Sequence, residues 1–282
     1  MKQIVWFLAF AMLAVGCQPM LPAPQTLRLY DLAQGRRLSE QEALARLETV
    51  RFVLVGEHHT DPADHAAQLA VIQALHSSGR KVAIGLEMFR KQDQAALDRW
   101  VAGEIDEAAF QPIYLDNWNF DWQLYRPIFE YARRYRLPMV GLNVPGEVTR
   151  QVAYHGFDSL SERQRASLPE IRCEVTPQYR EFVREAFGFH AHGRMNFDNF
   201  CQAQLLWDTA MAANAAHYSN QHPDRVMVLL AGAGHAHKMG IPAQLQKLGE
   251  SAFLVILPAP SEEGGSQEVT TDEADFLIES GR

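Results

Sequence analysis

The sequence contains few cysteines. The three that it has are Cys17, Cys173 and Cys201, and no two of them lie within five residues of each other. This spacing excludes a disulfide-dense scaffold and a metal site of the CxxC type. Each cysteine therefore has to be interpreted by itself.

An excess of positive charge is also absent. The chain has 26 Lys and Arg residues against 34 Asp and Glu residues, which gives a formal net charge of -8. We expect no nucleic-acid partner, because nucleic-acid binding depends on a basic surface. With 18 Gly and 14 Pro among 282 residues, the chain has too few of either for a fibrous protein, and 47% hydrophobic residues are typical of a globular one.

No hydrophobic run is long enough to span a membrane. The run over residues 4–15 follows Lys2. It would make a helix of about 18 Å, whereas a hydrocarbon core is about 30 Å thick. A short apolar run after a single cation predicts a signal peptide over residues 1–16.

The residues around Cys17 predict a lipid anchor. The segment Leu13-Ala-Val-Gly-Cys17 resembles the bacterial lipobox, which implies cleavage before Cys17 and its lipidation, palmitate included. The alternative is an ordinary secretory signal cleaved nearby. Gln18, and not Asp, follows the cysteine, which resembles the sorting pattern of outer-membrane lipoproteins. Residues 17–27 are rich in proline and form a tether between lipid and fold.

An exported chain lies in an oxidising compartment, so Cys173 and Cys201 are either joined in a disulfide or present as free thiols. They could pair, which would close a loop of about 28 residues and stabilise the fold by about 3 to 4 kcal/mol on the chain-entropy model. Otherwise they are two independent buried thiols.

Five short apolar runs predict buried strands, since continuous apolar runs without alternation are typical of parallel strands covered on both faces. They are residues 52–55, 82–86, 139–142, 226–230 and 253–257. Helical patterns lie between them, at residues 64–77, 90–101 and 125–135. The alternation predicts an α/β fold over residues 28–260, with an open, mainly parallel sheet and flanking helices.

Two regions differ from this pattern. Between about residues 146 and 222 the sequence favours helices and has no strand candidate, which predicts a helical cap or insertion. Residues 261–282 form an acidic C-terminal tail that is a poor core former, although residues 276–278 are apolar enough to dock on the domain.

Polar groups follow the strand candidates at corresponding positions. Because the carboxyl ends of parallel strands meet at one edge of the sheet, where ligands bind, we expect these groups to converge in one crevice. They are Glu57, His59 and Asp61 after the first run, Glu87 after the second, Asn143 after the third and His235 after the fourth. Structural capping of the strand ends is the alternative.

The glycines before His235 do not form a nucleotide-binding loop. The third glycine of a GxGxxG fingerprint that begins at Gly232 is replaced by His237. Gly232 and Gly234 are therefore expected to let the backbone turn tightly and bring His235 into the crevice.

The crevice residues suit two kinds of chemistry. Glu57, His59, Glu87 and His235 have the ligand types of a zinc or iron site, and the same pairs could act as general base and orienting acid for the attack of water. Neither an HExxH nor a CxxC spacing supports a metal. His65 either reaches the same crevice or faces solvent.

Residues 196–216 predict a helix that carries Gln204 and Asp208 one turn apart on an otherwise apolar stripe. Buried polar residues need partners, so these two either orient a histidine of the crevice as a supporting layer or cap a neighbouring loop. The aromatic residues between 179 and 200 either line a flat apolar ligand or form the core of the cap.

Together these motifs resemble the ChaN family of haem-binding, iron-regulated lipoproteins, which is related to the erythromycin esterase and Tiki superfamily. The resemblance spans residues 45–258. It rests on Val55-Gly-Glu-His-His-Thr-Asp61 with His65, Gly85-Leu-Glu-Met-Phe89, Gly141-Leu-Asn-Val-Pro145, Ala203-Gln-Leu-Leu-Trp-Asp208 with Met211-Ala212, and Ala231-Gly-Ala-Gly-His235.

The resemblance implies haem bound through the cap, between two subunits of a homodimer, and a role in haem iron acquisition together with an outer-membrane haem receptor system. Phenolate and imidazole are both established haem-iron ligands. The ligand candidates by chemistry are Tyr154, His155, Tyr179, His190 and His192. A binding protein is the leading hypothesis, and a metal-dependent hydrolase that uses Glu57, His59, Glu87 and His235 is the alternative.

Overall fold

The computed structural model describes residues 26–169, 175–190, 196–260 and 269–279. Residues 1–16, Cys17, Cys173 and His192 lie outside these ranges, as does the side chain of His190. The signal peptide, the lipid anchor and the pairing of Cys173 with Cys201 therefore stay predictions. Cys201 itself is buried.

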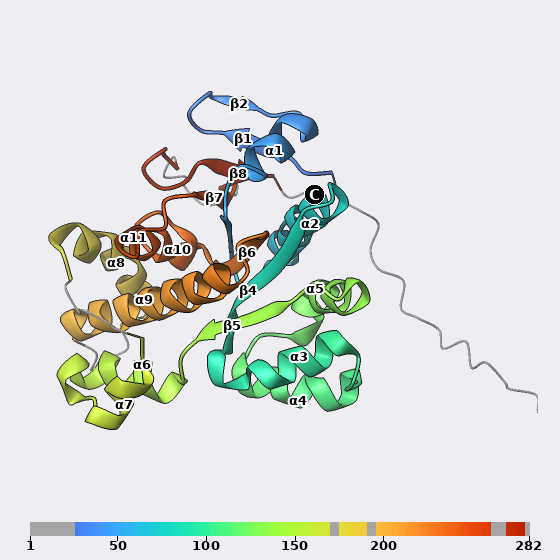
Figure 1. The fold of residues 1–282 in the computed structure, drawn as a ribbon. Coiled ribbons are helices and arrows are strands. Elements are labelled where there is room, and N and C mark those ends of the chain that lie inside the picture. The colour runs from blue at the N-terminus through green and yellow to red at the C-terminus, as the bar shows by residue number, and fades with distance from the viewer. Residues whose placement is uncertain (1–25, 170–174, 191–195, 261–268, 280–282) are drawn as a thin grey trace, which may run out of the picture.

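An eight-stranded sheet forms the centre of the molecule, in the order β2-β1-β8-β7-β3-β6-β4-β5 (Figure 1). Each of the five predicted apolar runs is confirmed as a strand, and these five run parallel to one another. They are β3 (Phe52–Glu57), β4 (Lys81–Arg90), β5 (Met139–Asn143), β6 (Arg225–Gly232) and β7 (Phe253–Pro258). The mainly parallel α/β fold predicted from the sequence is confirmed.

Three short strands extend one side of the sheet. The apolar segment in the acidic tail becomes β8 (Phe276–Ile278), which pairs parallel with β7. On its other side β8 pairs antiparallel with β1 (Leu29–Asp31), and β1 pairs with β2 (Arg36–Arg37). The first and last described strands therefore lie side by side.

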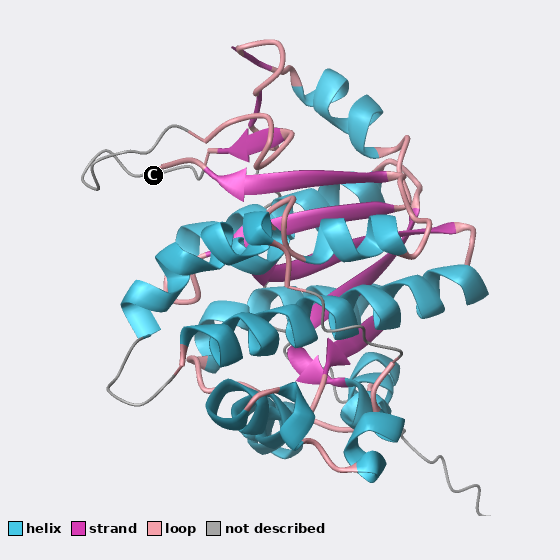
Figure 2. Cartoon of the chain, turned by 90° about the vertical axis from the view of Figure 1, so that its left-hand side faces the viewer, coloured by secondary structure: helices cyan, strands magenta, loops and turns pink. Residues whose placement is uncertain are grey.

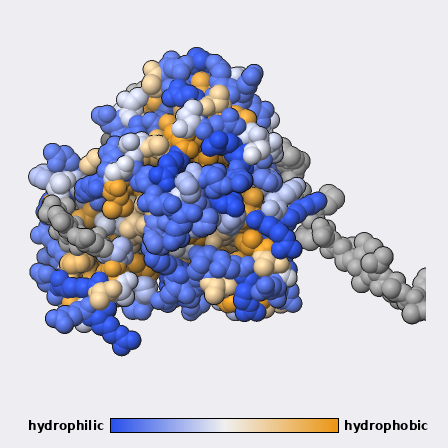
Figure 3. Space-filling view, in the orientation of Figure 1, coloured by the Kyte–Doolittle hydropathy of each residue, from blue (hydrophilic) through white to orange (hydrophobic). Residues whose placement is uncertain are grey.

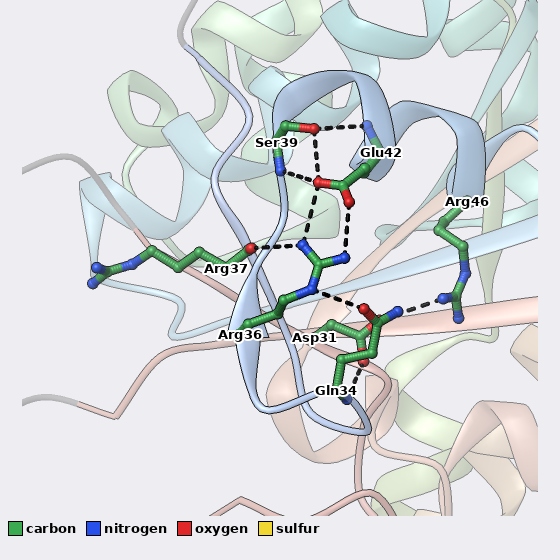
Figure 4. Close-up of polar contacts among 7 residues, drawn as sticks. All are labelled: Asp31, Gln34, Arg36, Arg37, Ser39, Glu42 and Arg46. Atoms are coloured by element: carbon green, nitrogen blue, oxygen red, sulfur yellow. Dashed lines mark hydrogen bonds and ion pairs between the residues drawn. The ribbon is translucent and has the colours of Figure 1, made fainter.

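A polar network fixes the N-terminal hairpin against α1 (Glu40–Leu47) (Figure 4). Ser39 and Glu42 form a capping box at the start of α1, in which each side chain binds the other residue's backbone N–H. Arg36 donates to Glu42 from β2, and Arg46 pairs with the buried Asp31 of β1. The capping residues thus begin the helix and also attach it to the hairpin.

Helices cover both faces of the sheet (Figure 2). The alternation of side chains along a strand divides them between the faces, so that Val53 of β3 and Val228 of β6 pack on one side while Leu54 and Leu229 pack on the other. The first face is covered by α1, α2 (Pro62–Ser77), α3 (Gln94–Ala102), α4 (Glu107–Asn117) and α5 (Trp122–Tyr135), and the second by α9 (Phe197–Gln221), α10 (Ala233–Ala236) and α11 (Ile241–Lys247).

The predicted helix at residues 90–101 begins later than expected. β4 continues to Arg90, a 3-10 turn η1 (Lys91–Asp93) follows, and α3 starts only at Gln94. The strand continues because its pairing with β5 shifts register between Leu86 and Arg90. Gly141 of β5 permits this, since a Cβ there would lie 2.7 Å from the carbonyl oxygen of Arg90.

The described residues between 146 and 222 contain helices and no strand. They are α6 (Gly146–His155), the 3-10 turn η2 (Phe157–Ser159), α7 (Glu162–Ser167), α8 (Pro177–His190) and α9. α9 is the long helix that joins this cap to the sheet, because it packs on α6 and α8 at one end and on β5 and α11 along its length. None of the described helices is both long and apolar enough to cross a membrane.

Candidate functional site

The carboxyl ends of β3, β6 and β4 bring the polar motifs together. β6 lies between the other two strands, with Glu57 of β3 opposite Gly232 and Leu86 of β4 opposite Leu230. Glu57 and Glu87 therefore lie on either side of the end of β6, where the chain turns into α10 and His235. Both glutamates are buried.

The first half of the site is a pair formed by Glu57 and His59. Glu57 Oε1 lies 2.5 Å from His59 Nδ1 and also accepts a hydrogen bond of 3.2 Å from the hydroxyl of Tyr125 on α5. The other carboxylate oxygen, Oε2, is buried and has no hydrogen-bond partner among the described residues. A buried carboxylate oxygen without a partner is unfavourable, so it is a place where a ligand could donate a hydrogen bond.

The second half is formed by Asp208 and His235. Asp208 Oδ1 on α9 lies 2.6 Å from His235 Nδ1, and Asp208 Oδ2 accepts a hydrogen bond of 2.6 Å from the hydroxyl of Tyr179 on α8. His235 Nε2 lies 3.8 Å from Glu87 Oε1. Glu87 Oε2 accepts from the backbone N–H of Gly232, which fixes that carboxylate between the two histidines.

Both histidines are more basic than usual. Burial acts to lower the pKa of His235, but the charges of Asp208 and Glu87 outweigh it and raise the pKa to about 9. Burial likewise opposes protonation of His59, and its hydrogen bond to Glu57 together with the charges of Glu57 and Glu87 holds its pKa above the ordinary value. His235 is therefore an imidazolium at neutral pH.

Aromatic side chains enclose His59. The ring centroid of His59 lies 5.0 Å from that of Trp118 and 4.6 Å from that of Phe120, both in the connection between α4 and α5. Gly232 also lies against the ring, since a Cβ there would come within 2.9 Å of His59 Cε1. The ring fits beside Glu87 only because residue 232 has no side chain.

The other residues expected in the crevice support its walls. Asp61 caps the start of α2 by accepting from the backbone N–H of Ala63. His65 is buried on α2, and its Nε2 lies 3.2 Å from the carbonyl oxygen of His59. Asn143 donates to the carbonyl oxygen of Glu87. Each of the three residues thus contacts the backbone of the site.

The two residues that were predicted as a supporting pair on α9 have different environments. Asp208 contacts His235 directly, whereas Gln204, one turn earlier, is only partly buried. Of the haem-ligand candidates, Tyr154 and His155 are exposed at the end of α6. Tyr179 is buried on Asp208, an arrangement that leaves its hydroxyl engaged within the protein.

Sequence reasoning did not identify Tyr125, Trp118 or Phe120 as parts of the site. Tyr125 appeared only as the first residue of a helical pattern, and 68 positions separate it from Glu57. The aromatic pair precedes that helix in a segment to which no element had been assigned. Only the packing of α5 on the first face of the sheet brings these residues to His59.

The metal expectation finds no support in the described part of the chain. Within it, no three His, Cys, Asp or Glu side chains are grouped as ligands for a metal ion. The side chains instead form two acid–histidine pairs, Glu57 with His59 and Asp208 with His235, and Glu87 lies 3.8 Å from His235.

Comparisons with known proteins identify proteins that are similar to this chain. Protein RETICULATA-RELATED 5, chloroplastic, of Arabidopsis thaliana is 22% identical to this chain. The alignment is 285 residues long and covers 89% of this chain. The chain spans only 38% of the length of that protein.

Among solved structures, ChaN of Campylobacter jejuni with cofacially bound haem has the same fold. It matches with a TM-score of 0.68 and 19% identity, over 89% of this chain and 96% of that one. An erythromycin esterase, EreC, in its open conformation matches with a TM-score of 0.48 and 17% identity, over 90% of this chain and 82% of that one.

The match of a family profile decides the assignment. The profile that describes haem-binding uptake proteins, Tiki superfamily, ChaN, covers residues 43–245. This range includes the strands β3 to β6, the cap and all residues of both acid–histidine pairs. The chain belongs to the ChaN family of haem-binding uptake proteins in the Tiki superfamily.

Proposed function

We propose that this protein binds haem through its cap, between two copies of the chain, and that it is an outer-membrane lipoprotein that serves haem iron acquisition. The observation that carries the haem proposal is the pair of exposed candidate ligands at the end of α6, in a chain of the ChaN family. Haem is the cargo of the protein in this proposal.

The residues at the end of α6 fit a haem group. Tyr154 is 46% exposed although it is large and apolar in part. The ring centroids of Tyr154 and His155 lie 6.3 Å apart. Phenolate and imidazole are both suitable axial ligands for ferric iron. Arg150 is exposed one helical turn before Tyr154, where it could pair with a propionate.

A surface location also suits a haem shared by two copies. Figure 3 shows apolar residues exposed in patches on a largely hydrophilic surface. A flat porphyrin ligated at an exposed site leaves much of its apolar area in water unless a second copy covers it. Binding between two protomers would therefore remove more apolar area from water than binding to one protomer.

The test of haem binding is a haemin titration of the mature chain. We expect a saturable shift of the Soret band and the charge-transfer band of tyrosinate-ligated ferric haem. Tyr154→Phe should remove the tyrosinate band and weaken binding at least tenfold. Tyr135→Phe is the matched control, because Tyr135 is 45% exposed but lies on α5, outside the cap. A titration without a saturable Soret shift refutes the proposal, and an unchanged band in Tyr154→Phe refutes the ligand.

The dimer and the anchor need separate measurements. Sedimentation velocity should show that haemin converts monomer to dimer, and a haemin complex that sediments as a monomer contradicts the shared site. In cells, Cys17→Ser should release the protein from the membrane fraction, and Gln18→Asp should move it from the outer to the inner membrane. Cys201→Ser is the control, and it should change neither location.

A second candidate function is hydrolysis of an ester or peptide bond in the crevice. It is favoured by the two acid–histidine pairs, which meet beside Glu87. His235, as an imidazolium, would donate a proton to the leaving group, and Glu87 would accept a proton from the attacking water.

Ester and peptide substrates test this second candidate directly. We expect His235→Ala to lower kcat/KM at least a hundredfold with the fold intact. Metal analysis of the purified protein belongs in the same experiment, since the hydrolase alternative was predicted to use a metal. Hydrolysis that survives unchanged in His235→Ala would refute the role of this residue.

A further inference from the structure

The two histidines of the crevice are held by contacts of the same kind. In each case a carboxylate oxygen binds Nδ1, at 2.5 Å from Glu57 to His59 and at 2.6 Å from Asp208 to His235. In each case a buried tyrosine donates its hydroxyl to the same carboxylate. Tyr125 binds the Glu57 oxygen that contacts His59, and Tyr179 binds the second oxygen of Asp208.

These two tyrosine–carboxylate–histidine relays come from unrelated parts of the fold. The first joins α5, β3 and the loop after β3, and the second joins α8, α9 and α10. Both tyrosines are nearly inaccessible to solvent, Tyr125 at 0% and Tyr179 at 4% exposure. A buried hydroxyl is costly unless it makes hydrogen bonds, and a bond to a carboxylate is among the stronger ones.

The relays determine which ring nitrogen each histidine turns to the crevice. With Nδ1 bound to a carboxylate, Nε2 is the nitrogen left for a ligand. His235 Nε2 lies 3.8 Å from Glu87 Oε1. On the other side, a Cβ built on Gly232 would lie 3.4 Å from His59 Nε2 and 3.7 Å from Glu87 Oε2. The two Nε2 edges therefore flank one carboxylate.

We propose that Tyr125 and Tyr179 are positioning residues, each of which holds a carboxylate that fixes one histidine, so that His59 and His235 present Nε2 to one oxygen-bearing group bound beside Glu87. The group is the ester or amide of the substrate, whose leaving group receives the proton of His235. The inference deepens the hydrolytic candidate and rests on it. It also makes the cap a necessary part of the site, because Tyr179 belongs to α8.

The cap helix contacts this region at a second point. The ring of Phe182, one turn after Tyr179, stacks on that of His237 with 4.3 Å between the centroids. α8 thus touches both the carboxylate that holds His235 and the residue two positions after His235. A displacement of α8 would disturb the second relay and leave the first in place.

Proton NMR of the mature chain tests the two relays separately. Short hydrogen bonds from imidazole Nδ1 to a carboxylate give proton resonances far downfield of the amide region, so we expect two from the buried relays. The contact of His58 Nδ1 with Asp64, at 2.7 Å, lies on a side chain that is 67% exposed, where the proton exchanges with water. Glu57→Gln should remove one and Asp208→Asn the other, which assigns them. Tyr125→Phe should then shift only the His59 resonance, and Tyr179→Phe only the His235 resonance.

Tyr131→Phe is the matched control for loss of a buried tyrosine hydroxyl. Tyr131 is also buried, but its hydroxyl lies 2.8 Å from Nδ1 of His76 and binds no carboxylate of the relays. We expect it to leave both resonances in place. A shift of both resonances by either relay variant, or of neither by its own variant, overturns the proposal.

Two further measurements keep the result independent of folding and proton exchange. Replacement of all tyrosines by difluorotyrosine makes the hydroxyls stronger donors without changing the fold, and it should shift both resonances. Long-range nitrogen–proton spectra report the protonated ring nitrogen even where a proton exchanges with water. A neutral tautomer that bears its proton on Nε2 in either histidine at alkaline pH contradicts the relay.

Measurements of ester and peptide hydrolysis distinguish a failure of the positioning roles from a failure of the hydrolytic candidate function. If the resonances respond as expected but no ester or peptide is cleaved, the positioning roles stand and hydrolysis fails. If substrates are cleaved and Tyr179→Phe changes neither the His235 resonance nor the pH profile of kcat/KM, hydrolysis stands and the positioning role of Tyr179 fails.

Discussion

Replacement of Asp208 by asparagine should change how the stability of the protein depends on pH. The folded-state pKa of His235 is about 9, against an ordinary value of 6.5. At about 1.4 kcal/mol for each pH unit, this gap corresponds to about 3 kcal/mol of stabilisation by the protonated histidine. His235 is 15% exposed in its side chain, so solvent screening reduces the interaction only slightly.

The direction of the effect follows from the raised pKa. The folded state holds the proton more tightly than the unfolded chain, so this stabilisation is complete below about pH 6.5 and is lost as the pH rises through about 9. Asp208→Asn removes the largest contribution that raises the pKa. Burial, which lowers this pKa and is the largest influence on it, then outweighs the remaining charge of Glu87, so the stabilisation by the protonated histidine should disappear.

Urea unfolding at pH 6.5 and pH 9.5 measures this effect. We expect Asp208→Asn to destabilise the protein by about 3 kcal/mol more at the lower pH than at the higher one. Asp198→Asn is the control, because Asp198 lies in the first turn of the same helix but pairs with Arg180. A loss of stability that is equal at both pH values would refute the assignment of the raised pKa to Asp208.

Three other substitutions test the packing and the caps, each by urea unfolding. Gly232→Ala should cost about 1 to 3 kcal/mol because its Cβ would collide with His59, whereas Gly234→Ala, with open space around it, should cost less than about 1 kcal/mol. Equal losses would contradict the collision. Phe110→Ala should cost about 3 to 5 kcal/mol, since its ring is fully buried, and a loss below about 1 kcal/mol would contradict its place in the core. Ser39→Ala should cost about 1 kcal/mol, and no loss would contradict the capping box.

The central strands and the edge at which polar groups meet could be predicted from the sequence. Runs such as residues 52–55 and 226–230 are apolar on both faces, which only a covered parallel strand explains well. The direction of parallel strands then places Glu57, Glu87 and His235 at one edge. The order and direction of the strands suffice for this part of the prediction, which requires no knowledge of how side chains pack.

The supporting contacts could not be predicted in the same way. Tyr125 was expected only as part of a helix, and Tyr179 as a residue of the cap core or a ligand of haem, whereas their carboxylate partners lie 68 and 29 positions away. Asp208 was expected to have a partner because it interrupts an apolar stripe, but the stripe does not identify which histidine it meets. Such contacts depend on how each helix packs, which local patterns do not specify.

The apolar segment at residues 276–278 shows a further limit. Three residues are too few for periodicity to distinguish a strand from a docked tail, and the acidic sequence before them predicted a poor core former. The structure pairs this segment on both sides, with β7 and β1. Hydrogen bonds to the two neighbours decide its conformation.

The position of β8 has a consequence for the order in which the chain can fold. β1 joins the sheet through β8, and its other neighbour is β2 of its own hairpin. Synthesis is vectorial, so β1 is made first yet has no sheet to join until residues 276–278 have emerged. The buried side chains of Leu29 and Ile278 then become covered in one late step. The sheet thereby becomes complete only after residues 276–278 have been made, and a chain that terminates before them keeps the β1–β2 hairpin undocked.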